Sequence, residues 1–331
     1  MSRIADLPKV ELHVHIEGTL EPELVLELAR DSGIDLGYAD ADDLRRRYAF
    51  TDLQSFLDIY YENMAVLRTP ADFARLAHAY AERAHAGGVV HAEVFFDPQA
   101  HTIRGVDLAD VVDGLVAGFD RAREEFGVTA DLIACFLRDR PVAEAQDTLD
   151  ALLALDAPII GVGLDSAEVG NPASKFTDVF ARAAAAGLHR VAHAGEEGGP
   201  DSIRNALTHL GITRIDHGIA SADDPALLAQ LAADGTPLTV CPFSNVALKT
   251  VTDLATHPLP RLIDAGVAVT INSDDPAYFG GYVDDNFTAI AHEFGFADDA
   301  LAALARNSVD ASFLTAERKS QIHDRIAAWL G

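Results

Sequence analysis

Short apolar runs rich in β-branched residues alternate along the chain with longer segments in which apolar residues recur at a helical period. The short runs are apolar at nearly every position, which is typical of parallel strands covered on both faces. They predict strands at 10–15, 89–96, 132–137, 159–164, 190–193, 214–217, 238–241 and 267–272. The longer segments predict helices at 22–32, 70–86, 109–125, 143–155, 174–186, 202–209, 224–233 and 259–265. Eight strand–helix units in this order predict an α/β fold, a (β/α)8 TIM barrel.

Two segments lie outside these eight units. Residues 36–67 are extra material after the first unit and are expected to form helices over one mouth of the barrel, and the helical tail 297–330 is expected to pack outside it. No linker interrupts the chain, so residues 1–331 are expected to form a single domain. A doubly wound open sheet is the alternative, but no Gly-x-Gly-x-x-Gly follows the first predicted strand, which disfavours its dinucleotide-binding form.

The overall charge narrows the classes of partner. The formal net charge is −27 at pH 7, which argues against nucleic acid as a partner, since its phosphates require a basic footprint on the protein.

No apolar run approaches the roughly 20 residues of a membrane helix, so no membrane partner is expected. The N-terminus lacks an apolar signal core and the chain holds two cysteines, which suits a reducing cytoplasm. The oligomeric state is left open.

Histidines and carboxylates gather at the ends of the predicted strands. His13 and His15 are separated by one residue, and alternate side chains of an extended strand share a face. In TIM barrels the active site lies at the C-terminal ends of the strands. Each polar residue alone could be an ordinary buried group, but together they predict one site. The groups lie at the ends of strands one, five, six and eight: His13 and His15, His193 to Glu197, Asp216 to Gly218, and Asn272 to Pro276.

Three of the histidines have the composition of a metal site. His13, His15 and His193 with one carboxylate, Asp274, would make a nitrogen-rich site with one open position, a pattern that describes catalytic zinc. Zinc lowers the pKa of a bound water to about 7 and so supplies hydroxide at neutral pH. Iron and manganese accept the same ligands, so the identity of the metal stays open.

Neighbouring residues suggest acid–base roles. Glu196 lies three residues beyond His193 and can reach the cavity as a proton donor without being a ligand. His217 is placed to orient or deprotonate the attacking water, and Asp275 to hydrogen-bond a ring nitrogen of the substrate. No His-Glu-x-x-His, Pro-Cys-x-x-Cys or Gly-x-Ser-x-Gly occurs, which disfavours zincin proteases, the zinc deaminases of nucleic-acid bases, and serine hydrolases.

These motifs, with Leu7-Pro8 before the first strand and the run 241–245 (Cys-Pro-Phe-Ser-Asn), resemble the adenosine, adenine and AMP deaminase family of metal-dependent barrel hydrolases. The matching segments run from residue 7 to about 286 in the family's order. The resemblance implies that zinc is held by His13, His15, His193 and Asp274. It also implies Glu196 as proton donor to purine N1, His217 as the base that orients water, and Asp275 as the partner of N7.

The resemblance further implies a small-molecule purine substrate, and its details favour the adenine deaminase branch. Nucleoside-acting members carry an aspartate that meets the ribose where this chain has Glu17, which is one methylene longer and could accept a hydrogen bond from N9–H of the free base. Ser166 and Glu168 add polar groups where those enzymes expose a glycine. Phe56 and Leu57, with Leu53, are expected to form an apolar gate over the purine, with ordinary helix core as the alternative.

Hydrolysis of adenine to hypoxanthine and ammonia, in purine salvage, is therefore the expected reaction. Adenosine deaminase, or a deaminase of an N6-substituted adenine or modified nucleoside, is the alternative with the same chemistry. A barrel that binds purine without turnover is disfavoured because every catalytic residue of the motifs is present. AMP deaminase is disfavoured because the long N-terminal extension is missing and the negative charge would repel phosphate.

Overall fold

Eight parallel strands form a barrel in the structure, a computed structural model that describes residues 3–331. Each strand pairs with the next along the chain, and backbone hydrogen bonds of 3.0 Å from His15 to Asp274 and from Asp274 to His13 join the last strand to the first. The predicted TIM barrel is confirmed. The strands are β1 Lys9–Glu11, β2 Val89–Phe96, β3 Thr129–Leu137, β4 Ile159–Asp165, β5 His189–Ala194, β6 Arg214–His217, β7 Leu238–Val240 and β8 Val269–Ile271.

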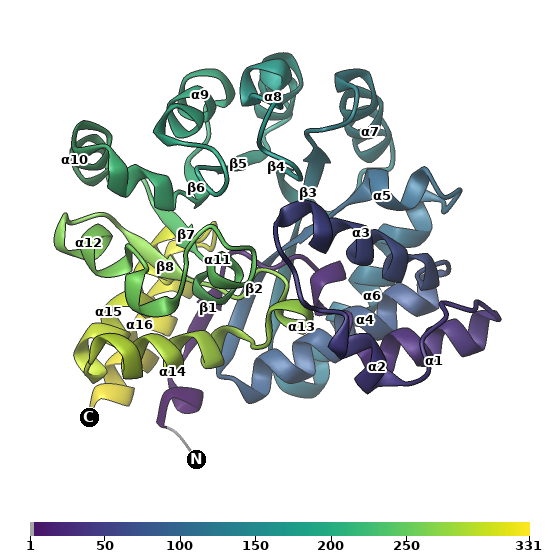
Figure 1. Cartoon of the computed structure of the whole chain (residues 1–331), viewed down its shortest axis with the longest axis horizontal. Helices are drawn as coiled ribbons and strands as arrows, with labels where there is room; N and C mark the ends of the chain where they lie inside the picture. Colours follow the sequence, from purple (N-terminus) through teal and green to yellow (C-terminus); the bar gives the residue numbers. More distant parts are fainter. Residues whose placement is uncertain (1–2) are drawn as a thin grey trace.

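Helices surround the strands, as Figure 1 shows. Each of the eight predicted helical segments coincides with a helix to within about three residues, except 174–186, which divides into a 3₁₀ turn (Ala173–Phe176) and α8. Several helices begin with proline at the first helical position, where its missing N–H costs nothing. The helices are α1 Pro22–Ser32, α2 Ala41–Arg46, α3 Leu53–Asn63, α4 Pro70–Ala86, α5 Pro98–Thr102, α6 Leu108–Phe126, α7 Val142–Ala154, α8 Thr177–Ala185, α9 Pro200–Leu210, α10 Pro225–Asp234, α11 Pro242–Ala247, α12 Leu259–Asp264, α13 Pro276–Phe279, α14 Val283–Phe294, α15 Asp298–Ala311 and α16 Ala316–Leu330. Among residues 3–331, none of these helices has the length and apolar character needed to cross a bilayer.

The first strand is shorter than predicted. β1 ends at Glu11, so the prediction that it continues to His15 is wrong. The Leu12 N–H donates to the Asn272 side chain at 2.8 Å, and the chain then follows β8 and β2 through single bridges rather than a continuous ladder. The two histidines of the first motif therefore lie just beyond the strand, in a segment held from both sides.

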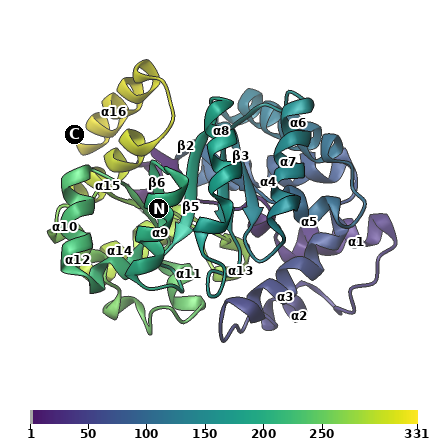
Figure 2. The same cartoon turned by 90° about the horizontal axis from the view of Figure 1, so that it is seen from above.

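The two extra segments lie at different ends of the molecule. Residues 36–67 form α2 and α3, and α3 covers the mouth at which the strands end, as predicted. The helical tail forms α15 and α16, which pack outside the barrel; Figure 2 shows them on the far side of the molecule from α2 and α3. An apolar lid cluster joins α3 to α13 and consists of Phe50, Leu53, Phe56, Leu57, Tyr60, Met64, Ala100, Leu137, Leu248, Tyr278 and Phe279.

A buried ion pair crosses the barrel interior below the site. Arg214 of β6 donates to Glu93 of β2 at 2.6 Å, and both side chains are almost fully buried. Phe313, from the turn between α15 and α16, donates its N–H to the same carboxylate and lies under the guanidinium at 4.7 Å. The C-terminal helical tail therefore contacts the Arg214–Glu93 ion pair, which links opposite sides of the barrel.

Replacing Arg214 with methionine is expected to destabilise the protein by about 3–5 kcal/mol, because the variant leaves the Glu93 carboxylate buried without its cation. The measurement is the midpoint of urea unfolding. Arg182→Met is the matched control, since Arg182 pairs with Asp150 on the exposed surface and should change stability by less than about 1 kcal/mol. Equal midpoints for the two variants would contradict this prediction.

Candidate active site and metal centre

A cavity at the C-terminal ends of the strands collects most of the predicted site residues. Polar groups from strand ends form its floor, and the α3 residues and Leu248 of the lid cluster form its roof. The lining residues are His15, Leu53, Phe56, Leu57, Tyr60, Tyr61, Asp97, Asp165, Ser166, His193, Glu196, His217, Leu248, Asp274 and Asp275. His13 lies beneath this layer, fully buried and in contact with Asp274.

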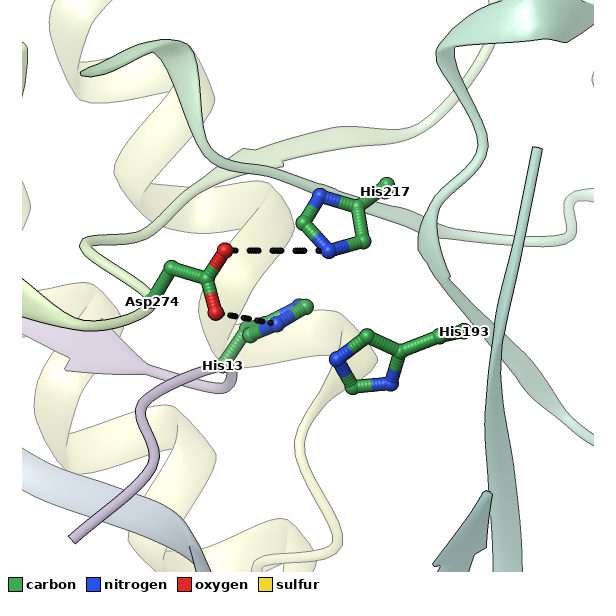
Figure 3. Close-up of side chains that lie close together, drawn as sticks. All are labelled: His13, His193, His217 and Asp274. Carbon is green, nitrogen blue, oxygen red and sulfur yellow. Dashed lines mark hydrogen bonds and ion pairs between the residues drawn. The ribbon is translucent and has the colours of Figure 1, made fainter. Parts of the chain in front are cut away.

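Imidazole nitrogens and one carboxylate converge at the centre of this floor. His13 Nε2 lies 3.1 Å from Asp274 Oδ1, and His15 Nε2 lies 3.5 Å from the same oxygen. His15 Nε2 also faces His193 Nε2 at 3.1 Å. Figure 3 shows His13 and Asp274 turned toward each other, with His193 and His217 beside them. Ligand atoms of His13, His193, His217 and Asp274 all lie within 4.8 Å of one another, which forms a buried metal-binding cluster.

In each predicted histidine ligand, Nδ1 points away from the centre of the cluster and toward an oxygen that can accept a hydrogen bond. His13 Nδ1 lies 2.9 Å from the Thr239 hydroxyl, which gives its own proton to Asp216 and therefore accepts from the imidazole. His15 Nδ1 lies 3.6 Å from Asp165, and His193 Nδ1 lies 3.7 Å from Asp216. The Thr239 hydroxyl keeps the proton of His13 on Nδ1 and leaves its Nε2 lone pair free. The nearby carboxylates favour the same tautomer for His15 and His193, which is the tautomer of metal-bound histidines.

His217 has the opposite arrangement. The Leu259 N–H donates to His257 Nδ1 at 3.0 Å, so His257 carries its proton on Nε2 and donates to the Asn245 carbonyl at 3.1 Å. The Asn245 amide then directs its NH₂ at His217 Nδ1, 3.4 Å away. A neutral His217 consequently holds its proton on Nε2, which faces the cavity and has no free lone pair there for a metal.

These residues fit a divalent cation. Without one, Nε2 of His13 and of His15 face the same carboxylate oxygen, and the Nε2 atoms of His15 and His193 face each other at 3.1 Å. A cation at this point would be coordinated by these nitrogens and by the Asp274 carboxylate. Burial lowers the pKa of His15 to about 4, so this imidazole is neutral and able to act as a ligand at neutral pH.

The two carboxyls beside the centre have pKa values raised by their surroundings. Burial, reinforced by the charge of Asp274, raises the pKa of Glu196 and of Asp275 well above the usual range. Glu196 lies 3.5 Å from His217 Nε2. Both groups can therefore be protonated at neutral pH, and raised carboxyl pKa values are typical of acids that act in catalysis.

Strained backbone marks the same site. Among residues 3–331, five residues other than glycine have a left-handed backbone, and three of them line the cavity: Ser166, His217 and Asp274, with φ of 67°, 63° and 66°. Each such residue costs of order 1 kcal/mol, and strain of this kind gathers at functional sites.

The predicted substrate residues occupy three different positions. Phe56, Leu57 and Ser166 line the cavity as expected. Glu17 is buried beside it and accepts from His101 at 2.7 Å and from the Asp97 N–H at 3.1 Å. Glu168 has a different position from the one expected, because its carboxylate faces the backbone of the loop after β5 rather than the cavity.

Sequence reasoning missed two acidic residues of the cavity wall. Asp97 follows β2 and Asp165 ends β4, and both are almost fully buried. Burial raises the pKa of Asp165 to about 7, and the pKa of Asp97 rises well above its usual range through burial and the adjacent Asp165. Their position at strand ends is the signal that could have identified them.

The family model described as adenosine deaminase matches residues 8–329. Adenine deaminase from Streptomyces coelicolor is 58% identical over 93% of this chain and 91% of its own length. The crystal structure of adenine deaminase from Arthrobacter aurescens superposes with a TM-score of 0.97 at 54% identity and covers 98% of this chain and 99% of that one. An amidohydrolase from Burkholderia ambifaria, solved with bound Zn, has a TM-score of 0.88 at 29% identity and covers 98% of this chain and 94% of its own.

The match extends over nearly the whole chain, and the motifs that carry it supply the floor of the cavity. The chain belongs to the adenosine deaminase family, in its adenine deaminase branch.

Proposed function

We propose that the protein is an adenine deaminase that hydrolyses adenine to hypoxanthine and ammonia in purine salvage, in the cytoplasm. The observation that carries this proposal is the 58% identity to an adenine deaminase over 93% of the chain, with the buried histidine and aspartate cluster intact. We also propose that residues 1–331 form a single domain, with all the proposed catalytic side chains at one mouth of the barrel.

Zinc is the metal that we propose for the site, with His13, His15, His193 and Asp274 as ligands. The relative from Burkholderia ambifaria was solved with bound Zn, and the three imidazoles with freed Nε2 lone pairs suit that ion. When bound, zinc supplies a water molecule activated for attack at neutral pH.

The protein's own residues move and hold the protons. Glu196, protonated through its raised pKa, donates to N1 of adenine as the water oxygen bonds to C6. His217 turns its Nε2–H toward the cavity, and we propose that it orients the water by donating to its oxygen. One proton of the attacking water passes to the amino group, which leaves as ammonia when the C6–N6 bond breaks. The other water proton returns to Glu196, and hypoxanthine keeps the carbonyl oxygen and the proton on N1.

Asp275 and the lid hold the purine. With its raised pKa, Asp275 is protonated and can donate to N7, which carries a lone pair in the N9–H form of adenine. Phe56 and Leu57 lie over the cavity and exclude water from the ring faces. Glu17 and Ser166 remain our candidates for the five-membered-ring edge.

Turnover of adenine and of adenosine, followed by the ultraviolet shift to the hypoxanthine chromophore, tests this function. We expect kcat/KM for adenosine to be lower by about 10²-fold or more, because a pocket that hydrogen-bonds N9–H leaves buried polar groups unpaired when ribose replaces the proton. Turnover of adenosine alone would overturn the free-base assignment. Turnover of neither, in enzyme loaded with zinc, would favour an N6-substituted or otherwise modified purine.

A further inference from the structure

One carboxylate holds the loop that carries Glu196. Glu168 lies after β4, is 6% exposed, and extends to the loop between β5 and α9. Four consecutive backbone N–H groups and one hydroxyl converge on it. Its Oε1 accepts from Gly195 at 2.7 Å and from the Ser202 hydroxyl, and its Oε2 accepts from Glu196 at 3.1 Å, Glu197 at 3.0 Å and Gly198 at 2.8 Å.

Glycines allow the loop to approach this carboxylate. Gly195 has a φ of 75°, in the left-handed region that other residues rarely adopt. A Cβ on Gly198 would lie 2.7 Å from Glu168 Oε1, closer than real side chains come. Successive N–H groups that turn around one anion form a compact binding concavity, and here a side chain of the same chain fills it.

A second side chain holds the end of β5 by one carbonyl group and ties it to the loop after β4. Arg138, after β3, donates to the His193 carbonyl at 2.7 Å and to the Asn171 carbonyl at 2.9 Å. The arginine thus fixes the end of β5, and Glu168 fixes the four residues that follow. Glu196 lies within the stretch that Glu168 holds and three residues beyond the carbonyl that Arg138 holds, so its backbone has little freedom.

We propose that Glu168 is a positioning residue that fixes the loop 195–198 and thereby the place of the Glu196 carboxyl relative to the substrate ring. The inference rests on the proposed function of Glu196 as the proton donor. Proton transfer requires hydrogen-bond geometry, and a displacement of about 1 Å can cost about 10²-fold in rate. In the described part of the chain, Glu168 is not among the cavity-lining residues, so it acts through the loop.

Glu168→Gln is the principal test, because glutamine matches glutamate in size but replaces one acceptor oxygen with an NH₂ that faces the loop N–H groups. We expect kcat for adenine to fall by about 10²-fold, with KM and the metal content of the purified enzyme unchanged. Hydrogen exchange of the amides of 195–198, followed by mass spectrometry, should become faster. Glu197→Gln is the matched control, since it removes a charge from the same loop and its amide oxygen can still accept from the Glu168 N–H.

Combining Glu168→Gln with Glu196→Gln tests whether Glu168 acts on kcat through Glu196. A residue that acts through Glu196 should cost nothing further once that carboxyl is gone, so Glu168→Gln and Glu196→Gln should be strongly non-additive in kcat. A raised KM at unchanged kcat would instead make Glu168 a substrate contact and overturn the proposal, as would loss of metal or unchanged amide exchange.

Ser202→Ala is a second, milder variant that can be measured if Glu168→Gln fails to fold. It removes one of the five donors and retains the charge, and we expect a smaller change of the same sign in both kcat and exchange. No change in either quantity would overturn the proposal. Failure of the wild type to act on adenine would contradict the proposed function, whereas the exchange comparison would still report whether Glu168 holds the loop.

Discussion

Replacing Glu196 with glutamine is expected to lower kcat for adenine by about 10²–10⁴-fold, the usual contribution of general acid–base catalysis by one side chain. Glutamine fills the same space and can still donate a hydrogen bond to N1, but it cannot transfer a proton. The raised pKa of Glu196, caused by burial and then by Asp274, gives this carboxyl the proton that the reaction needs at neutral pH. Steady-state turnover of adenine measures the loss.

Two measurements separate this effect from damage to the site. The metal content of Glu196→Gln should equal that of the wild type, because the side chain is not among the proposed ligands, and inhibition by hypoxanthine should persist. Glu197→Gln is the control, since its side chain lies on the same loop but is exposed and should leave kcat near the wild-type value. A Glu196→Gln enzyme within tenfold of the wild type would show that another group protonates the ring.

Alternation of apolar runs was enough to predict the barrel, because parallel strands buried on both faces and amphipathic helices have different periods. The end of β1 could not be predicted from that pattern. Residues 10–16 continue to alternate, but the Asn272 side chain takes the N–H of Leu12 and removes it from the ladder. A tertiary hydrogen bond to a residue 260 positions away thus ends the strand.

Some site residues could be predicted from the sequence and others could not, depending on whether a strand end or a loop places the side chain. His193 lies at the end of β5, and His13 and Asp274 lie just beyond β1 and β8, so these residues meet at the mouth of the barrel and position alone predicts them. Glu168 was assigned to the substrate from its place in the sequence, yet its side chain turns to a neighbouring loop. Because the sequence gives the register of a residue but not the direction of a long side chain in a loop, such positioning contacts emerge only from the structure.

The distinction between His15 and His217 as metal ligands depends on where each ring carries its proton. Both rings approach Asp274, with Nε2 at 3.5 Å and 3.7 Å from its two oxygens, so distance does not separate them. His15 Nδ1 lies 3.6 Å from the Asp165 carboxylate, which favours the tautomer with the proton on Nδ1 and a bare Nε2. His217 turns Nδ1 toward the NH₂ of Asn245, which leaves the proton on Nε2.

His15→Ala is therefore expected to purify with only traces of metal and to lose turnover, whereas His217→Ala should keep its metal and lose turnover alone. Loss of an outer partner of a ligand commonly costs 10–100-fold in metal affinity, so loss of a ligand should cost more. Elemental analysis of protein purified without chelator, followed by titration with zinc, measures this difference. His217→Gln retains an N–H donor and should recover part of the turnover lost in His217→Ala if His217 orients the water by donation. Loss of metal in His217→Ala with full metal in His15→Ala would reverse the two assignments, because the freed lone pair would then belong to His217.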